Sequence, residues 1–175
     1  MNNQRGSQSV RLITRGAIVA ALYVALTYLS ALFGLASGVI QFRLSEALCV
    51  LPMFMPEAIA GLTVGCLISN ILTGGVPMDV ICGSLATLLG AVGAYLLRRI
   101  SPRLSFLATL PTVLANALII PPVLIFAYGA TDGYLFILAT VTLGEVVTAT
   151  GLGGYLGYTL KKTDLLGKMG IVKRR

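Results

Sequence analysis

The feature that most constrains the fold is the alternation of long apolar runs with a few clusters of basic residues. Hydrophobic residues make up 57% of the 175 positions and charged residues only 11%, whereas a soluble domain carries about 25% charged residues. The chain therefore belongs in a lipid bilayer, and its length suits six spans of about 20 residues each. We predict an all-α integral membrane bundle of six transmembrane helices.

The basic residues predict the topology of this bundle. All but one of the 13 lysines and arginines gather in three places, and Arg43 stands alone. The three clusters are Arg5, Arg11 and Arg15; Arg98, Arg99 and Arg103; and Lys161, Lys162, Lys168, Lys173, Arg174 and Arg175. Cytoplasmic loops carry such an excess of positive charge, so we expect both termini in the cytoplasm and no nucleic-acid partner. The predicted order is a basic tail (residues 1–11), one transmembrane domain (12–160) and a second basic tail (161–175).

Prolines and glycines divide the apolar stretches into helices. The expected helices cover residues 14–33, 42–54, 57–72, 80–97, 104–128 and 134–160. The second of these is short or bent, because Pro52 and Pro56 break the chain on either side of a tight turn. Pro111 and the adjacent Pro121 and Pro122 are expected to interrupt the fifth.

Small residues recur at four-residue spacing on two of the expected helices. The first helix carries Ala17, Ala21 and Ala25, which form a smooth face that another helix can approach closely. This face is a candidate docking surface for a partner, or alternatively an ordinary packing face within the bundle. Gly61 and Gly65 form a similar face on the third helix, where close helix packing is the simplest interpretation.

The candidate binding site consists of polar side chains in otherwise apolar helices. An ionisable group at the centre of a bilayer costs roughly 2.5 to 3.5 kcal/mol on insertion scales, so such groups are usually paired, facing a cavity, or functional. The candidates are Arg43, Glu46, Asn70, Asp79, Asn116 and Glu145. The strongest signal is Glu145, because this carboxylate lies at mid-depth with no charged partner within a turn of its own helix.

Structural roles remain open for several of these residues. Arg43 and Glu46 stand three apart and could form an ion pair at the outer end of the second helix. Asp79 could cap the fourth helix. Asn116 could simply bridge two helices by a hydrogen bond.

Enzyme chemistry finds little support in the sequence. The chain has no histidine, and Cys49, Cys66 and Cys82 stand singly in apolar stretches, so neither a zinc site nor a disulfide framework is expected. The GxSxG, HExxH and P-loop motifs do not occur either. We therefore expect no enzymatic activity, no metal and no cofactor.

Several separate blocks of the chain, in the same order, are similar to one known family. These blocks are RLSEALCVLP, PEAIAGLTVGCLISNIL, DVICGSLATLLGA, NALIIPPV and LGEVV. The chain resembles the QueT family of queuosine-precursor transporters, which are substrate-binding (S) components of energy-coupling factor (ECF) importers.

The resemblance implies a function for the six polar candidates and for the alanine face of the first helix. It implies an outward-facing binding cavity for a 7-deazaguanine such as 7-aminomethyl-7-deazaguanine or queuine. It also implies a membrane coupling subunit and two ATPase subunits as partners, with the alanine face of the first helix as the docking surface. The alternatives are an S component for another small vitamin-like molecule, or a stand-alone channel or ion-coupled carrier.

The polar candidates are chemically compatible with such a base. A 7-deazaguanine presents N–H donors on one edge, a carbonyl acceptor and, in the aminomethyl form, a cation. Carboxylates accept from the donors and the amine, whereas arginine and asparagine donate to the carbonyl.

Overall fold

The computed structural model describes residues 2–36, 38–100 and 102–163, and within them every regular element is a helix. In chain order the elements are α1 (Asn2–Leu32), η1 (Leu44–Met53), α2 (Glu57–Leu72), α3 (Pro77–Leu96), η2 (Pro102–Thr109), α4 (Leu110–Phe126), α5 (Tyr134–Glu145), η3 (Val146–Gly153) and α6 (Gly154–Thr163). The elements η1 and η2 are 3₁₀-helices, and η3 is a π-helix. The predicted all-α class is confirmed. Most of the predicted C-terminal tail lies outside the described residues.

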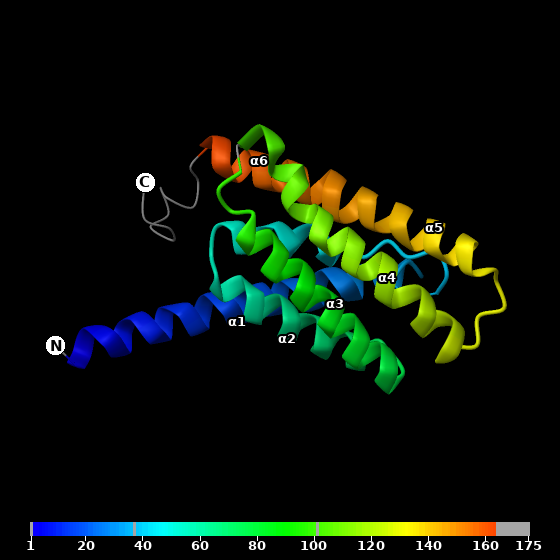
Figure 1. Cartoon of the computed structure of the whole chain (residues 1–175). Helices are drawn as coiled ribbons and strands as arrows, with labels where there is room; N and C mark the ends of the chain where they lie inside the picture. The colour runs from blue at the N-terminus through cyan, green and yellow to red at the C-terminus, as the bar shows by residue number, and fades with distance from the viewer. Residues whose placement is uncertain (1, 37, 101, 164–175) are drawn as a thin grey trace.

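These elements make six helical segments in the described part of the chain, because η2 leads into α4 and because α5, η3 and α6 follow one another as a single rod (Figure 1). Four segments are long and apolar enough to cross a membrane. They are Gly6–Leu32, Pro77–Leu96, Leu104–Phe126 and Tyr134–Thr163. The other two, η1 and α2, are shorter apolar helices.

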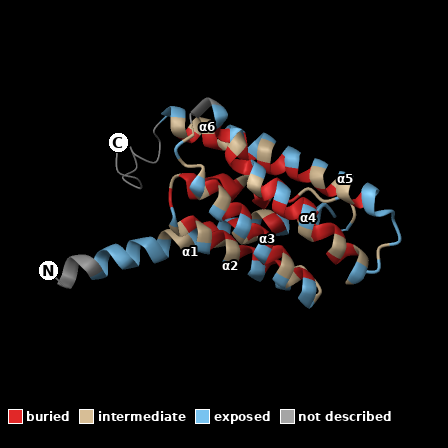
Figure 2. Cartoon of the chain, viewed as in Figure 1, coloured by how far each residue is buried: buried red, intermediate tan, exposed pale blue. Residues whose placement is uncertain are grey.

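The helices α1 to α5 pack side by side in an order that follows the chain. Helix α2 packs between α1 and α3, and α4 packs between α3 and α5. The N-terminal part of α1 projects beyond the other helices, and its side chains from Gly6 to Thr14 are exposed (Figure 2). The buried residues lie on the faces that the helices turn toward one another.

The short helix η1 lies at the centre of the bundle. It contacts α1, α2 and α3 as well as η3 and α6, and most of its residues are buried. A 3₁₀-helix rises about 2 Å per residue, so ten residues reach about 20 Å, less than a hydrocarbon core of about 30 Å. Its boundaries match the predicted short second helix, and Pro52 lies inside its last turn.

Glycines allow the neighbouring helices to approach closely. A Cβ atom on Gly61 would lie 2.5 Å from the Gly16 carbonyl oxygen, so α1 and α2 meet backbone to backbone. This contact confirms the packing role predicted for Gly61. On the other side of the bundle, a Cβ on Gly144 would overlap the carbonyl oxygen of Gln41, and one on Gly153 would lie 2.8 Å from that of Ala47. The rod from α5 to α6 therefore lies tightly against η1 and the residues before it.

Three local expectations were wrong. Helix α1 begins at Asn2 rather than near Thr14, because no proline breaks the polar N-terminal stretch. Helix α3 begins at Pro77, with Val76 at the N-cap position, since proline is well suited to the first helical turn. Asp79 therefore lies inside the first turn and does not cap the helix.

The proline pair in α4 also behaves differently from the prediction. Pro121 and Pro122 lie inside a helix that continues to Phe126, so they do not interrupt it. Proline is tolerated in transmembrane helices where neighbouring groups satisfy the freed carbonyls.

Candidate functional site

All six polar candidates are buried. Their side chains are at most 9% exposed, and they come from five different elements or the residues next to them. Arg43 directly precedes η1, which carries Glu46, whereas Asn70, Asp79, Asn116 and Glu145 come from α2, α3, α4 and α5. We call these six residues the polar cluster.

The arginine of the polar cluster pairs with an aspartate from a distant part of the chain. Arg43 Nη2 lies 3.9 Å from Asp79 Oδ2, and Arg43 Nε donates to the carbonyl oxygen of Ala36 at 2.8 Å. The other contact of Asp79 Oδ2 is the Tyr128 hydroxyl, which donates to it at 2.8 Å. Among the described residues, Arg43 thus forms its ion pair with Asp79 and not with Glu46, the alternative that the three-residue spacing had left open.

Tyr128 follows α4 and lies outside the membrane-spanning segments. Partial burial and the hydrogen bond to Asp79 raise the pKa of its hydroxyl. The phenol therefore stays protonated and acts as a hydrogen-bond donor to the carboxylate.

Two side chains, Tyr23 of α1 and Cys49 of η1 itself, donate hydrogen bonds to Glu46. The Tyr23 hydroxyl of α1 donates to Glu46 Oε1 at 2.5 Å, and Cys49 Sγ donates to Glu46 Oε2 at 3.0 Å. Tyr23 is fully buried. Both carboxylate oxygens are thus satisfied within the protein.

Glu145 has an oxygen without a partner. Glu145 Oε2 is a buried atom with no hydrogen-bond partner, and the nearby Asn116 donates from its Nδ2 atom to the Thr112 carbonyl oxygen at 3.2 Å. The Thr112 hydroxyl, one turn before Asn116 on α4, is likewise buried without a partner. A buried polar atom without a partner costs about 1 to 3 kcal/mol, so Glu145 Oε2 marks the part of the cluster that is incomplete.

Asn70 is held between its own helix and α3. Its Nδ2 atom lies 3.5 Å from the Asp79 carbonyl oxygen and 3.6 Å from Cys66 Sγ. A Cβ on Gly83 would lie 2.9 Å from the same nitrogen, so glycine at position 83 makes room for the amide.

Sequence reasoning missed several members of the site. Tyr23, Cys49, Thr112 and Tyr128 all bond to, or lie beside, the polar cluster. Only Tyr23 left a signal, because it forms one polar stripe on α1 with Thr27 and Ser30, at spacings of four and three residues.

The same stripe holds η1 against α1. Thr27 Oγ1 lies 2.8 Å from Ser45 Oγ, and the Leu44 N–H donates to Ser30 Oγ at 3.0 Å. These bonds and the one from Tyr23 to Glu46 fix the first turn of η1, which carries Glu46.

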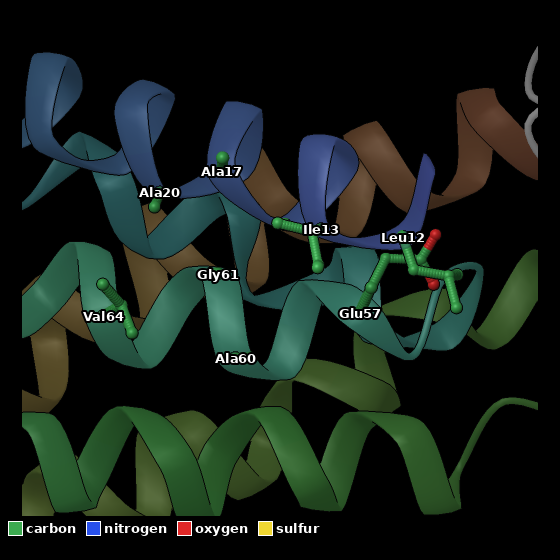
Figure 3. A pocket seen from close by; sticks show the side chains of 9 residues that line it. Leu12, Ile13, Ala17, Ala20, Glu57, Ala60, Gly61 and Val64 are labelled. Carbon is green, nitrogen blue, oxygen red and sulfur yellow. The ribbon is translucent and has the colours of Figure 1, made fainter. Parts of the chain in front are cut away.

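Residues of α1 between Leu12 and Ala20 line a groove with α2, outside the polar cluster (Figure 3). Its volume is about 380 Å³, and it is lined mainly by small or apolar residues that include Gly16, Ala17, Ala20, Ala60 and Gly61. The three alanines predicted as a docking face, Ala17, Ala21 and Ala25, are all exposed. An ion pair between Arg15 and Glu57, at 3.4 Å, joins α1 to the first turn of α2 beside this groove.

The chemistry of the polar cluster is that of binding. It combines three carboxylates with one guanidinium and two amides, which accept and donate hydrogen bonds. Among the described residues, no group of three histidine, cysteine, aspartate or glutamate side chains could hold a metal ion. A buried cluster of this kind in a multi-pass helical membrane protein is characteristic of a transport protein.

Comparison with known proteins identifies the family. The QueT transporter family matches residues 13–162, nearly the whole chain, so the chain belongs to the QueT transporter family. The family resemblance and the prediction of a membrane transporter without enzymatic activity are both confirmed. The chain is 49% identical over 72 residues to the "Queuosine precursor transporter QueT" of Lactococcus lactis subsp. cremoris (strain MG1363). That match covers 41% of this chain and 42% of the relative. No solved structure matches the chain.

The hydrogen bond from Tyr23 to Glu46 can be tested by removing one hydroxyl. Tyr23→Phe leaves Glu46 Oε1 without its donor, which should cost about 1 to 3 kcal/mol of folding stability. Thermal unfolding of the purified protein in detergent measures the change. Tyr28→Phe is the matched control, because Tyr28 lies on the same helix and is 54% exposed. Equal melting temperatures for the two variants would contradict the assigned role of Tyr23.

Proposed function

We propose that this protein is the substrate-binding subunit of an ATP-driven importer of the energy-coupling factor type. Its cargo is a queuosine precursor, a 7-deazaguanine such as 7-aminomethyl-7-deazaguanine or queuine. Membership of the QueT transporter family and the similarity to the queuosine precursor transporter of Lactococcus lactis support this cargo.

The observation that carries the proposal is the unpartnered Oε2 atom of Glu145. It is a hydrogen-bond acceptor on a side chain that is 9% exposed, next to Asn116 and within the electrostatic range of Arg43 and Glu46. An N–H edge or an amine of the base would satisfy this acceptor. Asn70, Asn116 and Arg43 supply donors for the carbonyl group of the same ligand.

Ligand binding by the purified subunit tests this function directly. We expect isothermal titration calorimetry to detect binding of 7-aminomethyl-7-deazaguanine. Glu145→Gln should weaken that binding by roughly 5- to 150-fold, because a ligand donor left unsatisfied costs about 1 to 3 kcal/mol.

The control is Asp132→Asn, the same carboxylate-to-amide change at an exposed loop position, which should leave the affinity unchanged. Absence of binding to the wild-type protein would contradict the assigned cargo. In that case, this protein would be an S component for another small molecule. Mass spectrometry of the small molecules that co-purify with it would identify that cargo. Unchanged affinity in a folded Glu145→Gln variant would remove Glu145 from the site.

The orientation that we propose has both termini in the cytoplasm, on the evidence of the basic clusters. Single cysteines introduced into a protein without Cys49, Cys66 and Cys82 test it. A cysteine at Thr131 should react with a membrane-impermeant reagent in intact cells, whereas one at Arg99 should react only after permeabilisation. The reverse pattern would invert the topology.

We further propose that the alanine face of α1 docks on a membrane coupling subunit that acts with two ATPases. The exposure of Ala17, Ala21 and Ala25 and the neighbouring groove support this assignment. Small residues allow a partner helix to approach closely, and packing is the main force between helices in lipid.

A bulky side chain on this face should separate transport from binding. Ala21→Trp should abolish uptake and co-purification with the ATPases, and substrate binding by the isolated subunit should stay intact. Ala139→Trp is the control, because Ala139 is an exposed alanine on α5. Equal loss of binding and transport would show internal packing instead, and uptake by the protein alone in liposomes would indicate a stand-alone carrier.

A further inference from the structure

The polar cluster contains more negative than positive groups. Three carboxylates, of Glu46, Asp79 and Glu145, accompany a single guanidinium, that of Arg43, and none of these side chains is more than 9% exposed. Arg43 is paired with Asp79 at 3.9 Å. Among the described residues, the ion pairs include neither Glu46 nor Glu145, so two buried carboxylates have no cation of their own.

The surroundings of Glu145 do not offset its charge. It faces one like charge, Glu46 of η1, and one opposite charge, Arg43, which is already paired with Asp79. Cys49 of η1 also lies close to it. Helix α4, which packs against α5, offers Asn116 but has no titratable side chain.

The remaining titratable groups lie around Arg43. They are Tyr23 of α1, Cys66 of α2 and Asp79 of α3. None of them is a cation, so Arg43 is the one positive charge among the groups named here.

The hydrogen bonds distinguish the two glutamates. Glu46 receives donors on both oxygens, from Tyr23 and from Cys49, and donors of this kind stabilise a carboxylate. Glu145 has one oxygen with no partner. A buried charge without a partner costs far more than a buried neutral group, and two neighbouring carboxylates in such a site do not both ionise readily.

We propose that the ligand-free protein carries a proton on Glu145 and that binding of a cationic ligand releases this proton. The ammonium group of the ligand, already charged in water, takes the place of the proton beside Glu145. The proton leaves to the solvent, and the charge of the site stays the same. A neutral ligand cannot replace the proton, so the proton remains.

This inference rests on the proposed function, since it takes 7-aminomethyl-7-deazaguanine as the cationic ligand. The neutral comparison is 7-cyano-7-deazaguanine, which keeps the same ring. Proton exchange thus depends on the charge of the ligand rather than on recognition of the base.

Titration calorimetry of the full-length protein measures the exchange. Binding is followed at one pH in buffers with different ionisation enthalpies, and the slope gives the number of protons released. We expect about one proton for the aminomethyl base and about none for the cyano base. On lowering the pH, the affinity for the cation should fall by up to about tenfold per pH unit, because protons compete for the site, and the affinity for the neutral base should stay flat.

Glu145→Gln provides the matched variant. It should bind the aminomethyl base without releasing a proton, whereas release that persists would come from another group and would overturn the assignment to Glu145. If this variant does not fold, the pH dependence of the wild-type protein with the two ligands decides the question.

The outcomes separate this inference from the proposed function. Binding of the aminomethyl base with no proton exchange and no pH dependence would overturn the inference and leave the proposed function standing. Equal release with both ligands would overturn it as well. Absence of binding to either base would overturn the proposed function, and this inference with it.

Discussion

The structure depends on the burial of η1, a ten-residue 3₁₀-helix, at the centre of a membrane bundle. Backbone and side-chain polar groups in a bilayer must find hydrogen-bond partners within the protein. The backbone hydrogen bonds of a 3₁₀-helix have poorer geometry than those of an α-helix. The surrounding helices hold η1 from two sides. Tyr23, Thr27 and Ser30 of α1 bond to the first turn of η1, and Gly144 and Gly153 bring the rod from α5 to α6 into backbone contact with it and the residues before it.

The polar cluster follows from this arrangement. Because η1 is too short to cross the membrane, Glu46 stays in the interior of the bundle, where side chains from the longer helices reach it. A π-helix begins directly after Glu145, and π-helical turns are often found at functional sites. The result is a group of carboxylates in which Asp79 is paired with Arg43, Glu46 is hydrogen-bonded on both oxygens, and Glu145 is left incomplete. Such a site favours ligands rich in donors or carrying a positive charge.

Helix α1 has one face that packs against η1 and another that is exposed. Its buried stripe, from Tyr23 to Ser30, holds the turn that carries Glu46. Its other face carries the exposed Ala17, Ala21 and Ala25, and of these Ala17 also lines the groove with α2. A partner that docks on this second face would therefore bind the same helix that positions a site glutamate, which gives docking and ligand binding a common structural element.

The sequence by itself determined the membrane class, the helical fold, the short second helix and the burial of six polar residues, because these follow from apolar length, proline positions and the cost of placing charge in lipid. The tertiary structure alone decided which of these residues pair. Arg43 pairs with Asp79 of α3 rather than with Glu46 three positions away, and Glu46 accepts a hydrogen bond from Tyr23 of α1 as well as from Cys49. Asp79 is part of the site and does not cap α3. Pairing depends on distances between segments that the helix packing brings together, and neither spacing nor hydropathy along the chain contains those distances.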